Sequence, residues 1–404
     1  MLKIKTYVEK YGIIFSYIFL TFALLIKYIS RYGKGDYSYS EYFINYSTGF
    51  TRRGLTGELI LKSPDFIQSN IFLILTMLQI VALAYNFILL FKIGKILNLS
   101  QAQQFFLVFC PSFIGFSSWS YSNAFKKDSF IIAFLLTFVF KYLVLKNRSD
   151  PHVLITFCFF SLVFSIPLML IHEVIIFIIA PFIMVILVRA YKALKSKTPS
   201  LFREKFFGFV VLFWIAINLF FVYLILGGKN YNAEINFKAV EAFKPLNFGP
   251  FQSLHDIGYY GKPISAKLSD QTTLYTYLFC LVFTHLILCR FLNLRAYFKY
   301  FLYNIHLIFF ALVIFSDWDR LIQFWTLSLF CHYCLNQPQN VKESKFGKKV
   351  TDKISFLKNP QIPGFIYFIV FRVPGTPTPI YFFDSFALLV FIKFFFNLDV
   401  RFLN

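Results

Sequence analysis

Apolar residues in this chain are gathered into long blocks that alternate with short polar segments. Most blocks are about 17–25 residues long, the length at which an α-helix crosses the hydrocarbon core of a bilayer. The pattern predicts twelve membrane spans, at residues 11–30, 69–92, 104–120, 128–146, 153–171, 174–191, 206–226, 272–292, 299–316, 320–335, 362–372 and 380–396. The expected fold class is an all-α, polytopic transmembrane helical bundle that forms one membrane domain over residues 1–404.

Two features of these spans are unusual. The fifth and sixth meet at His172-Glu173 with almost no loop, and the eleventh is short enough to be re-entrant. The first block ends in Lys27-Tyr-Ile-Ser-Arg31 rather than at a small-residue cleavage site, so we expect it to stay as a span.

Basic residues are distributed unevenly between the two sets of loops. The amino-terminal segment carries three lysines, and loops 189–205 and 342–358 are rich in Lys and Arg. Short loops rich in Lys and Arg stay in the cytoplasm. Both termini are therefore expected in the cytoplasm, and the outer face receives segments 31–68, 117–128, 172–173, 227–271, 317–320 and 372–379. The outer loops at 31–68 and 227–271 are the longest of these, and residues 236–243 of the second are expected to form a short helix.

Composition excludes several classes of protein. The net charge of +21 is spread over loops between spans. Because no basic domain is separate from the spans, nucleic-acid binding is not expected. The spacing of Cys331 and Cys334 resembles half of a zinc site but lacks a second pair, so we expect buried free cysteines, no metal and no cofactor. The chain contains no phosphate-binding G-x-x-x-x-G-K-[ST] loop, no dinucleotide fingerprint and no H-E-x-x-H zinc helix.

The segment Tyr42–Leu61 concentrates charge in the first outer loop. Arg52 and Arg53 precede two glycines and Glu58. With Thr51 as its cap, the segment predicts an amphipathic helix on the membrane surface, with Leu55 and Leu59 facing the bilayer. Two guanidinium groups beside free backbone N–H groups suit a phosphate ligand. The alternative is that both arginines only contact lipid headgroups.

The pair His172-Glu173 lies between two apolar blocks. Ionisable side chains inside a membrane are costly unless they face a cavity or a partner. The pair is therefore a candidate general base or acid, and the alternative is a polar turn at the membrane interface.

Other outward charges are candidates for the same site. Asp317 and Arg320 are spaced as i, i+3, so an ion pair within one helix competes with a role in catalysis or binding. Asp128 is placed to cap the following span, and Lys126 and Lys127 can extend a phosphate patch. Arg372 precedes a Pro-rich turn on the outer face and is a further candidate. Weaker candidates on that face are Asp36, Glu41, His255 and Asp256.

A family resemblance follows from four short motifs and the topology. The segments GFTRRGLTGEL, FKKDSF, LIHE and DWDR, with about twelve spans and an extended outer loop, resemble bacterial O-antigen or capsule repeat-unit polymerases. The resemblance implies the bacterial cytoplasmic (inner) membrane, with the site facing the periplasm. It also implies transfer of a growing glycan from an undecaprenyl diphosphate carrier to the next repeat unit.

The resemblance also suggests roles for residues. Arginines and other basic residues would hold the diphosphate, and a His or carboxylate would deprotonate the acceptor, without a metal or cofactor. The candidates are Arg52, Arg53, Glu58, Lys127, Arg320 and Arg372 for binding, and His172, Glu173 and Asp317 for catalysis. The implied partners are polyprenyl-diphosphate-linked glycans, the lipid bilayer and a chain-length regulator protein, and not nucleic acid.

Two alternatives stay open. A GT-C type glycosyltransferase, which uses a polyprenyl-phosphate sugar, carries an acidic residue in its first outer loop, often followed by a surface helix. Asp36 and Glu41 fit that position, although they do not form an adjacent acidic pair. A transporter of lipid-linked glycans is the third class, but transporters place charges mid-span or show broken helices and repeats.

Overall fold

The structure is a computed structural model of the 404-residue chain. It describes residues 37–48, 53–100, 126–145, 151–172, 174–195, 201–226, 231–243, 245–252, 281–289, 297–313 and 318–336, and single positions 18, 22, 103, 104, 107 and 278. The chain divides into two compact units, one formed by residues 25–96 and 125–262, the other by residues 1–24, 97–124 and 263–404. The first of these is called unit 2 and the second unit 1, and each is considered by itself.

The described residues form helices and no strand, which confirms the all-α prediction in this part of the chain. The described helices of unit 2 include α2 (Tyr37–Ser40), the 3-10 helix η1 (Glu41–Phe43), α3 (Leu55–Leu61), α4 (Asp65–Ser69), α5 (Ile71–Ile96), α8 (Asp128–Leu145), α9 (Pro151–Ile171), α10 (Val174–Lys195), α11 (Leu201–Leu226) and α12 (Ala233–Lys238). Unit 1 contains α16 (Tyr297–Val313) and α17 (Trp318–Asn336), and residues 281–289 are also helical.

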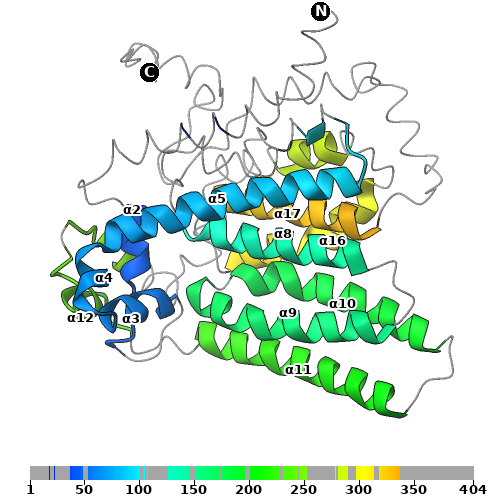
Figure 1. The fold of residues 1–404 in the computed structure, drawn as a ribbon, viewed down its shortest axis with the longest axis horizontal. Coiled ribbons are helices and arrows are strands. Elements are labelled where there is room, and N and C mark those ends of the chain that lie inside the picture. Colours follow the sequence, from blue (N-terminus) through cyan, green and yellow to red (C-terminus); the bar gives the residue numbers. More distant parts are fainter. Residues whose placement is uncertain are drawn as a thin grey trace, which may run out of the picture. The chain divides into compact units, whose positions relative to one another are not determined.

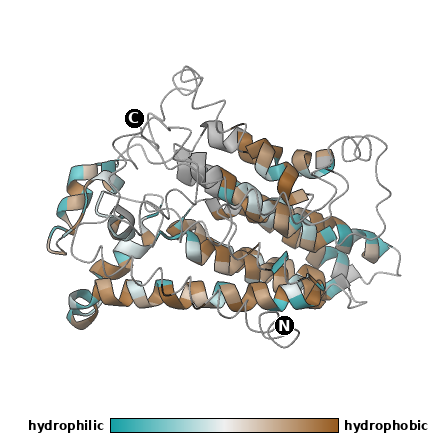
Figure 2. Ribbon diagram, turned by 90° about the horizontal axis from the view of Figure 1, so that it is seen from above, coloured by the Kyte–Doolittle hydropathy of each residue, from teal (hydrophilic) through white to brown (hydrophobic). Residues whose placement is uncertain are grey.

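Among the helices that the structure describes, four are long and apolar enough to cross a membrane, which indicates a membrane protein. They are α5, α8, α9 from His152 and α10 from Phe177. At about 1.5 Å per residue, even the 18-residue α8 is about 27 Å long. Their brown apolar lengths stand out against polar ends in Figure 2. The total of twelve spans stays a prediction, because blocks 11–30, 104–120, 362–372 and 380–396 lie largely or wholly outside the described residues.

The long helices of unit 2 run side by side: α5 and α8 are parallel, and α8, α9, α10 and α11 alternate in direction (Figure 1). Helix α5 packs on α8, and α9 contacts α8, α10 and α11. The starts of α5, α8 and α10 and the ends of α9 and α11 therefore lie at one end of the bundle, beside α3, α4 and α12 (Figure 1). Four segments that were predicted on the outer face, 31–68, 117–128, 172–173 and 227–271, have described parts that lie together at this end of the bundle. The opposite end carries Lys92, Lys95, Lys141, Arg189, Lys192, Lys195 and Lys205.

The first loop is built around the backbone of Phe43 to Asn45. The amide of Gly57 donates to the carbonyl of Ile44 at 3.2 Å, so α3 lies against this backbone. A Cβ at residue 57 would collide with the carbonyl oxygens of Phe43 and Ile44, which explains why a glycine occupies the position.

Residues from the second long loop hold the same backbone from the other side. The side-chain oxygen of Asn236 accepts from the Asn45 amide at 3.1 Å, and its amide nitrogen donates to the Asn45 carbonyl at 2.7 Å. The side chain of Asn45 donates in turn to the Asn236 carbonyl at 3.0 Å. The backbone amide of Asn247 donates to the Ser40 hydroxyl at 2.7 Å. These contacts fix the described part of loop 227–271 on the first loop.

Two short helices begin at residues other than those predicted. Helix α3 begins at Leu55 after Gly54, and not after a Thr51 cap, because Arg53 has φ 64°, a left-handed value that a right-handed helix cannot include. Helix α12 begins at Ala233 rather than at Asn236, because the side chain of Asn232 accepts from the Ile235 amide at 3.1 Å and caps the first turn.

Candidate functional site

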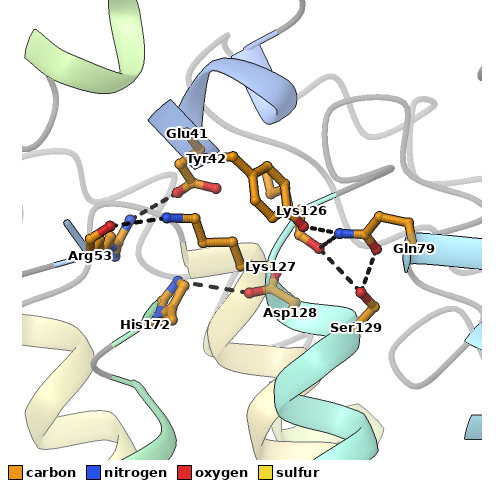
Figure 3. A network of polar contacts seen from close by, with 9 residues as sticks. All are labelled: Glu41, Tyr42, Arg53, Gln79, Lys126, Lys127, Asp128, Ser129 and His172. Atoms are coloured by element: carbon orange, nitrogen blue, oxygen red, sulfur yellow. Dashed lines mark hydrogen bonds and ion pairs between the residues drawn. The ribbon is translucent and has the colours of Figure 1, made fainter. Parts of the chain in front are cut away.

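Six ionisable side chains lie together at the end of unit 2 where α8 begins and α9 ends (Figure 3). Each is at most 7% exposed, and they come from the first loop, the start of α8 and the residue after α9. We call them the buried charge cluster; they are Glu41, Arg53, Lys126, Lys127, Asp128 and His172. Three are basic and two are carboxylates, with the imidazole in addition, so basic side chains outnumber acidic ones.

Arg53 and Glu41 form the ion pair of this cluster. The guanidinium Nη1 lies 2.9 Å from the carboxylate Oε1, and both side chains are buried. Glu41 is the first residue of η1, and the left-handed backbone of Arg53 turns its side chain back across twelve residues. A buried pair of this kind is costly to break, since removal of one partner leaves an uncompensated charge in the protein interior.

Lys127 connects the start of α8 to the first loop. Its side chain is fully buried, and its ammonium group donates to the backbone carbonyl of Arg53 at 3.2 Å. The same ammonium lies 5.5 Å from the centre of the Tyr42 ring, within the range of a cation–π interaction. Lys127 thereby holds the backbone of Arg53 in place and adds a second basic group to the cluster.

His172 and Asp128 form the second charged pair. The imidazole Nε2 lies 3.8 Å from the carboxylate Oδ1, and both residues are buried. His172 follows the last residue of α9, where its amide donates to the carbonyl of Leu168 at 2.8 Å. Asp128 is the first residue of α8, where a carboxylate also interacts favourably with the helix dipole. A carboxylate facing Nε2 favours the tautomer with its proton there, which leaves Nδ1 as the basic nitrogen.

A neutral network supports the cluster on the side of α5 (Figure 3). The Gln79 amide donates to the Tyr42 hydroxyl and, at 3.1 Å, to the Lys126 carbonyl. The Ser129 hydroxyl donates to the side-chain oxygen of Gln79. Burial, followed by the charges of Glu41 and Asp128, raises the pKa of Tyr42 well above its ordinary value. Tyr42 is therefore a neutral phenol at physiological pH.

Glu58, a predicted binding residue, belongs to a different set of contacts. Its carboxylate accepts from the Tyr46 amide at 3.2 Å and pairs with Lys62 at 2.8 Å. The hydrogen bond from Lys62 is the main cause that lowers the pKa of Glu58. Glu58 thus stabilises the first loop and α3 rather than joining the buried charge cluster.

The structure brings together three of the nine predicted site residues. Arg53, Lys127 and His172 meet in the buried charge cluster, which Glu58 does not join. Arg52, Glu173, Asp317 and Arg372 lie outside the described residues, and for Arg320 only the backbone within α17 is described. The roles of all nine residues stay predictions.

Two carboxylates were underestimated from sequence. Glu41 was a weak candidate, and Asp128 was expected to cap a helix, whereas α8 begins at Asp128 itself and its carboxylate faces His172. For Asp128 the signal was present, because this carboxylate adjoins the apolar block 128–146 at the end of an outer segment.

No group of three His, Cys, Asp or Glu side chains in the described ranges is placed to hold a metal ion. Among the described positions, Cys158, Cys289, Cys331 and Cys334 are free and buried. Comparison of the chain with protein-family models, curated proteins and solved structures found no match.

Proposed function

We propose that the chain is a membrane glycosyltransferase that polymerises undecaprenyl-diphosphate-linked repeat units into O-antigen or capsule. The reaction takes place on the outer face of the bacterial inner membrane. The observation that carries this proposal is the buried charge cluster, in which basic side chains outnumber carboxylates beside a His–Asp pair.

The excess of basic side chains supports an anionic ligand. Buried cations interact with a phosphate more strongly than exposed ones, because the surrounding protein screens charge poorly. Lys127 and Arg53 are the cations whose contacts with the first loop are defined. A diphosphate that replaces Glu41 as the partner of Arg53 receives hydrogen bonds from a guanidinium fork and an ammonium group.

The His172–Asp128 pair supports proton transfer. In the proposed step, an acceptor hydroxyl attacks the anomeric carbon of the donor glycan, forming a new glycosidic C–O bond. The bond from that carbon to the diphosphate oxygen breaks, and the diphosphate leaves with the electron pair. His172 takes the hydroxyl proton on Nδ1, and Asp128 stabilises the imidazolium from the side of Nε2. Lys127 and Arg53 stabilise the charge on the departing diphosphate.

The distribution of basic residues supports the orientation. The end of unit 2 opposite the cluster carries the basic side chains of α5, α8, α10 and α11, which is typical of a cytoplasmic face. The cluster then faces outwards, where nucleotide sugars are absent. A glycosyl donor used there must be linked to a lipid.

A second candidate, transfer of one sugar from a polyprenyl phosphate, is favoured by Glu41. This first-loop carboxylate is buried in the cluster, and the short helices α3 and α4 follow it before the span α5. In that reaction Glu41, released from Arg53, is the base, and His172 has a supporting role.

Deletion of the gene in the source bacterium separates the two functions. Lipopolysaccharide and capsule from the deletion strain are analysed by gel electrophoresis and mass spectrometry. A single complete repeat unit on each acceptor supports polymerisation. A repeat unit that lacks one sugar supports the single-sugar transferase. Surface polysaccharide identical to that of the parent strain overturns both.

A further inference from the structure

Two large apolar side chains protrude from the short helices between the buried charge cluster and the first described span. Leu59 of α3 is 61% exposed and Phe66 of α4 is 75% exposed, although neither helix is part of a span. Exposed apolar side chains that continue into a larger apolar surface indicate an apolar partner, whereas isolated ones need no explanation.

The inner face of α3 is already occupied. Gly57 and Ile60 are buried, and Gly57 contacts the backbone of Ile44. Leu59 lies on the opposite face, together with the exposed end of Lys62. A long lysine chain beside a leucine is typical of a helix at the membrane interface, since the amine reaches the headgroups while the methylenes cover apolar surface.

The position of α4 in the chain identifies the partner. Only Asn70 separates α4 from α5, a helix long and apolar enough to cross the membrane. A chain extends at most about 3.5 Å per residue, so Phe66 lies within about 17 Å of the start of α5. The exposed apolar side chains continue along α5 itself, at Leu73, Met77, Leu78, Val81, Tyr85 and Ile88. Phe66 is therefore held at the level where the bilayer begins.

The sequence already predicts α3 on the membrane surface; we propose that α4 extends it into an interfacial anchor, in which Phe66 as well as Leu59 enters the headgroup–acyl boundary of the bilayer. Asp65 and Ser69, which are exposed on α4, stay in the headgroup region. Because Arg53 lies two residues before α3, the anchor holds the buried charge cluster near the lipid phosphates. The anchor does not depend on the proposed function, and its test requires no enzymatic activity.

Spin labelling of the full-length protein tests the anchor. Leu59→Cys, Phe66→Cys and Asp65→Cys are each labelled with a nitroxide and reconstituted into vesicles of phosphatidylethanolamine and phosphatidylglycerol. Power saturation then compares the accessibility of each label to oxygen, which concentrates in lipid, and to a water-soluble nickel chelate. The unsubstituted protein, treated identically, gives the signal from native cysteines.

The expected result is a higher ratio of oxygen to nickel accessibility at positions 59 and 66 than at position 65. All three positions are at the surface, so the substitutions leave the packed core unchanged, and gel filtration verifies that each variant is monodisperse. A ratio at either position 59 or position 66 as low as that at position 65 places that side chain in water and overturns the anchor.

Discussion

The side-chain ammonium of Lys127 donates a hydrogen bond to the backbone carbonyl of Arg53, at 3.2 Å and across 74 residues of sequence. Arg53 has a left-handed backbone, with φ 64°, unlike the other described residues from 54 to 61. A non-glycine residue in this region is strained, and it persists where surrounding contacts hold it. Lys127 is such a contact, so the start of α8 determines how Arg53 is presented.

Replacing Lys127 with Met is expected to destabilise the protein by about 1–3 kcal/mol, because it leaves the Arg53 carbonyl buried without its donor. Unfolding by sodium dodecyl sulfate in mixed micelles, followed by circular dichroism, measures the loss. Lys141→Met, at an exposed position of α8, is the matched control and should change stability little. Equal stability of the two variants would contradict a structural role for the Lys127 ammonium.

The ion pair of Arg53 with Glu41 can be compared with a surface pair in the same loop. Glu41→Gln leaves Arg53 buried without its carboxylate, and the expected cost is about 3–5 kcal/mol. Glu58→Gln weakens the pair with the exposed Lys62, which should cost about 0.3–0.5 kcal/mol. The same unfolding assay measures both. A similar cost for the two substitutions would show that Glu41 and Arg53 are not a buried pair.

Two glycines offer a second matched comparison. Gly57→Ala is expected to displace η1 and lower stability, because the new methyl group meets the carbonyls of Phe43 and Ile44. Nothing lies within 4 Å of a Cβ at Gly208, inside α11, so Gly208→Ala should raise helix stability by about 0.5–1 kcal/mol. Thermal unfolding in detergent distinguishes the two directions. A neutral Gly57→Ala would contradict the close contact between α3 and the 43–45 backbone.

The sequence predicted helices well where the apolar blocks were long. Predicted spans 69–92, 128–146, 153–171 and 174–191 correspond to α5, α8, α9 and α10 with ends that differ by a few residues. Length and apolar character are local properties, so they can be recognised without knowing what a helix packs against.

The partners of the polar residues could not be predicted in the same way. Asn45 and Asn236 are 191 residues apart, and no periodicity or spacing connects them. The sequence also suggested that Arg53 is free to bind a ligand, whereas its guanidinium already pairs with Glu41. Such pairings depend on how several segments fold together, and a buried charge selects its partner only once that fold exists.

Tyr46 is expected to make stability depend on alkaline pH. Burial, followed by the charge of Glu58, raises the pKa of this phenol from 10.0 to about 12. Because the folded pKa is the higher one, the stabilisation is complete below pH 10 and is lost as the pH rises from about 10 to about 12. The stability of the parent protein relative to Tyr46→Phe should therefore fall over that range. A difference that is constant from pH 9 to 12 would contradict it.

The final prediction concerns His172 and the proposed reaction. If His172 takes the proton of the acceptor hydroxyl, His172→Ala should lower the rate of polysaccharide elongation by about 10²–10⁴-fold while the protein remains inserted in the membrane. Asp128→Asn keeps the size of the side chain but removes its charge. It should therefore reduce the rate of elongation more than it weakens substrate binding. Complementation of the deletion strain, with chain length read from gels and protein level from immunoblots, measures both effects.

His152 provides the control for this experiment. It lies in the first turn of α9, where its ring stacks on Phe206 and a ring nitrogen bonds to the Thr156 hydroxyl at 3.2 Å. His152→Ala removes an imidazole at the start of α9, the end of that helix away from the cluster. Chain length should stay normal in this variant. Normal chain length in His172→Ala as well would exclude His172 as the base. A repeat unit that lacks one sugar in Glu41→Gln alone, at a normal protein level on the immunoblot, would then favour the first-loop carboxylate and transfer of a single sugar.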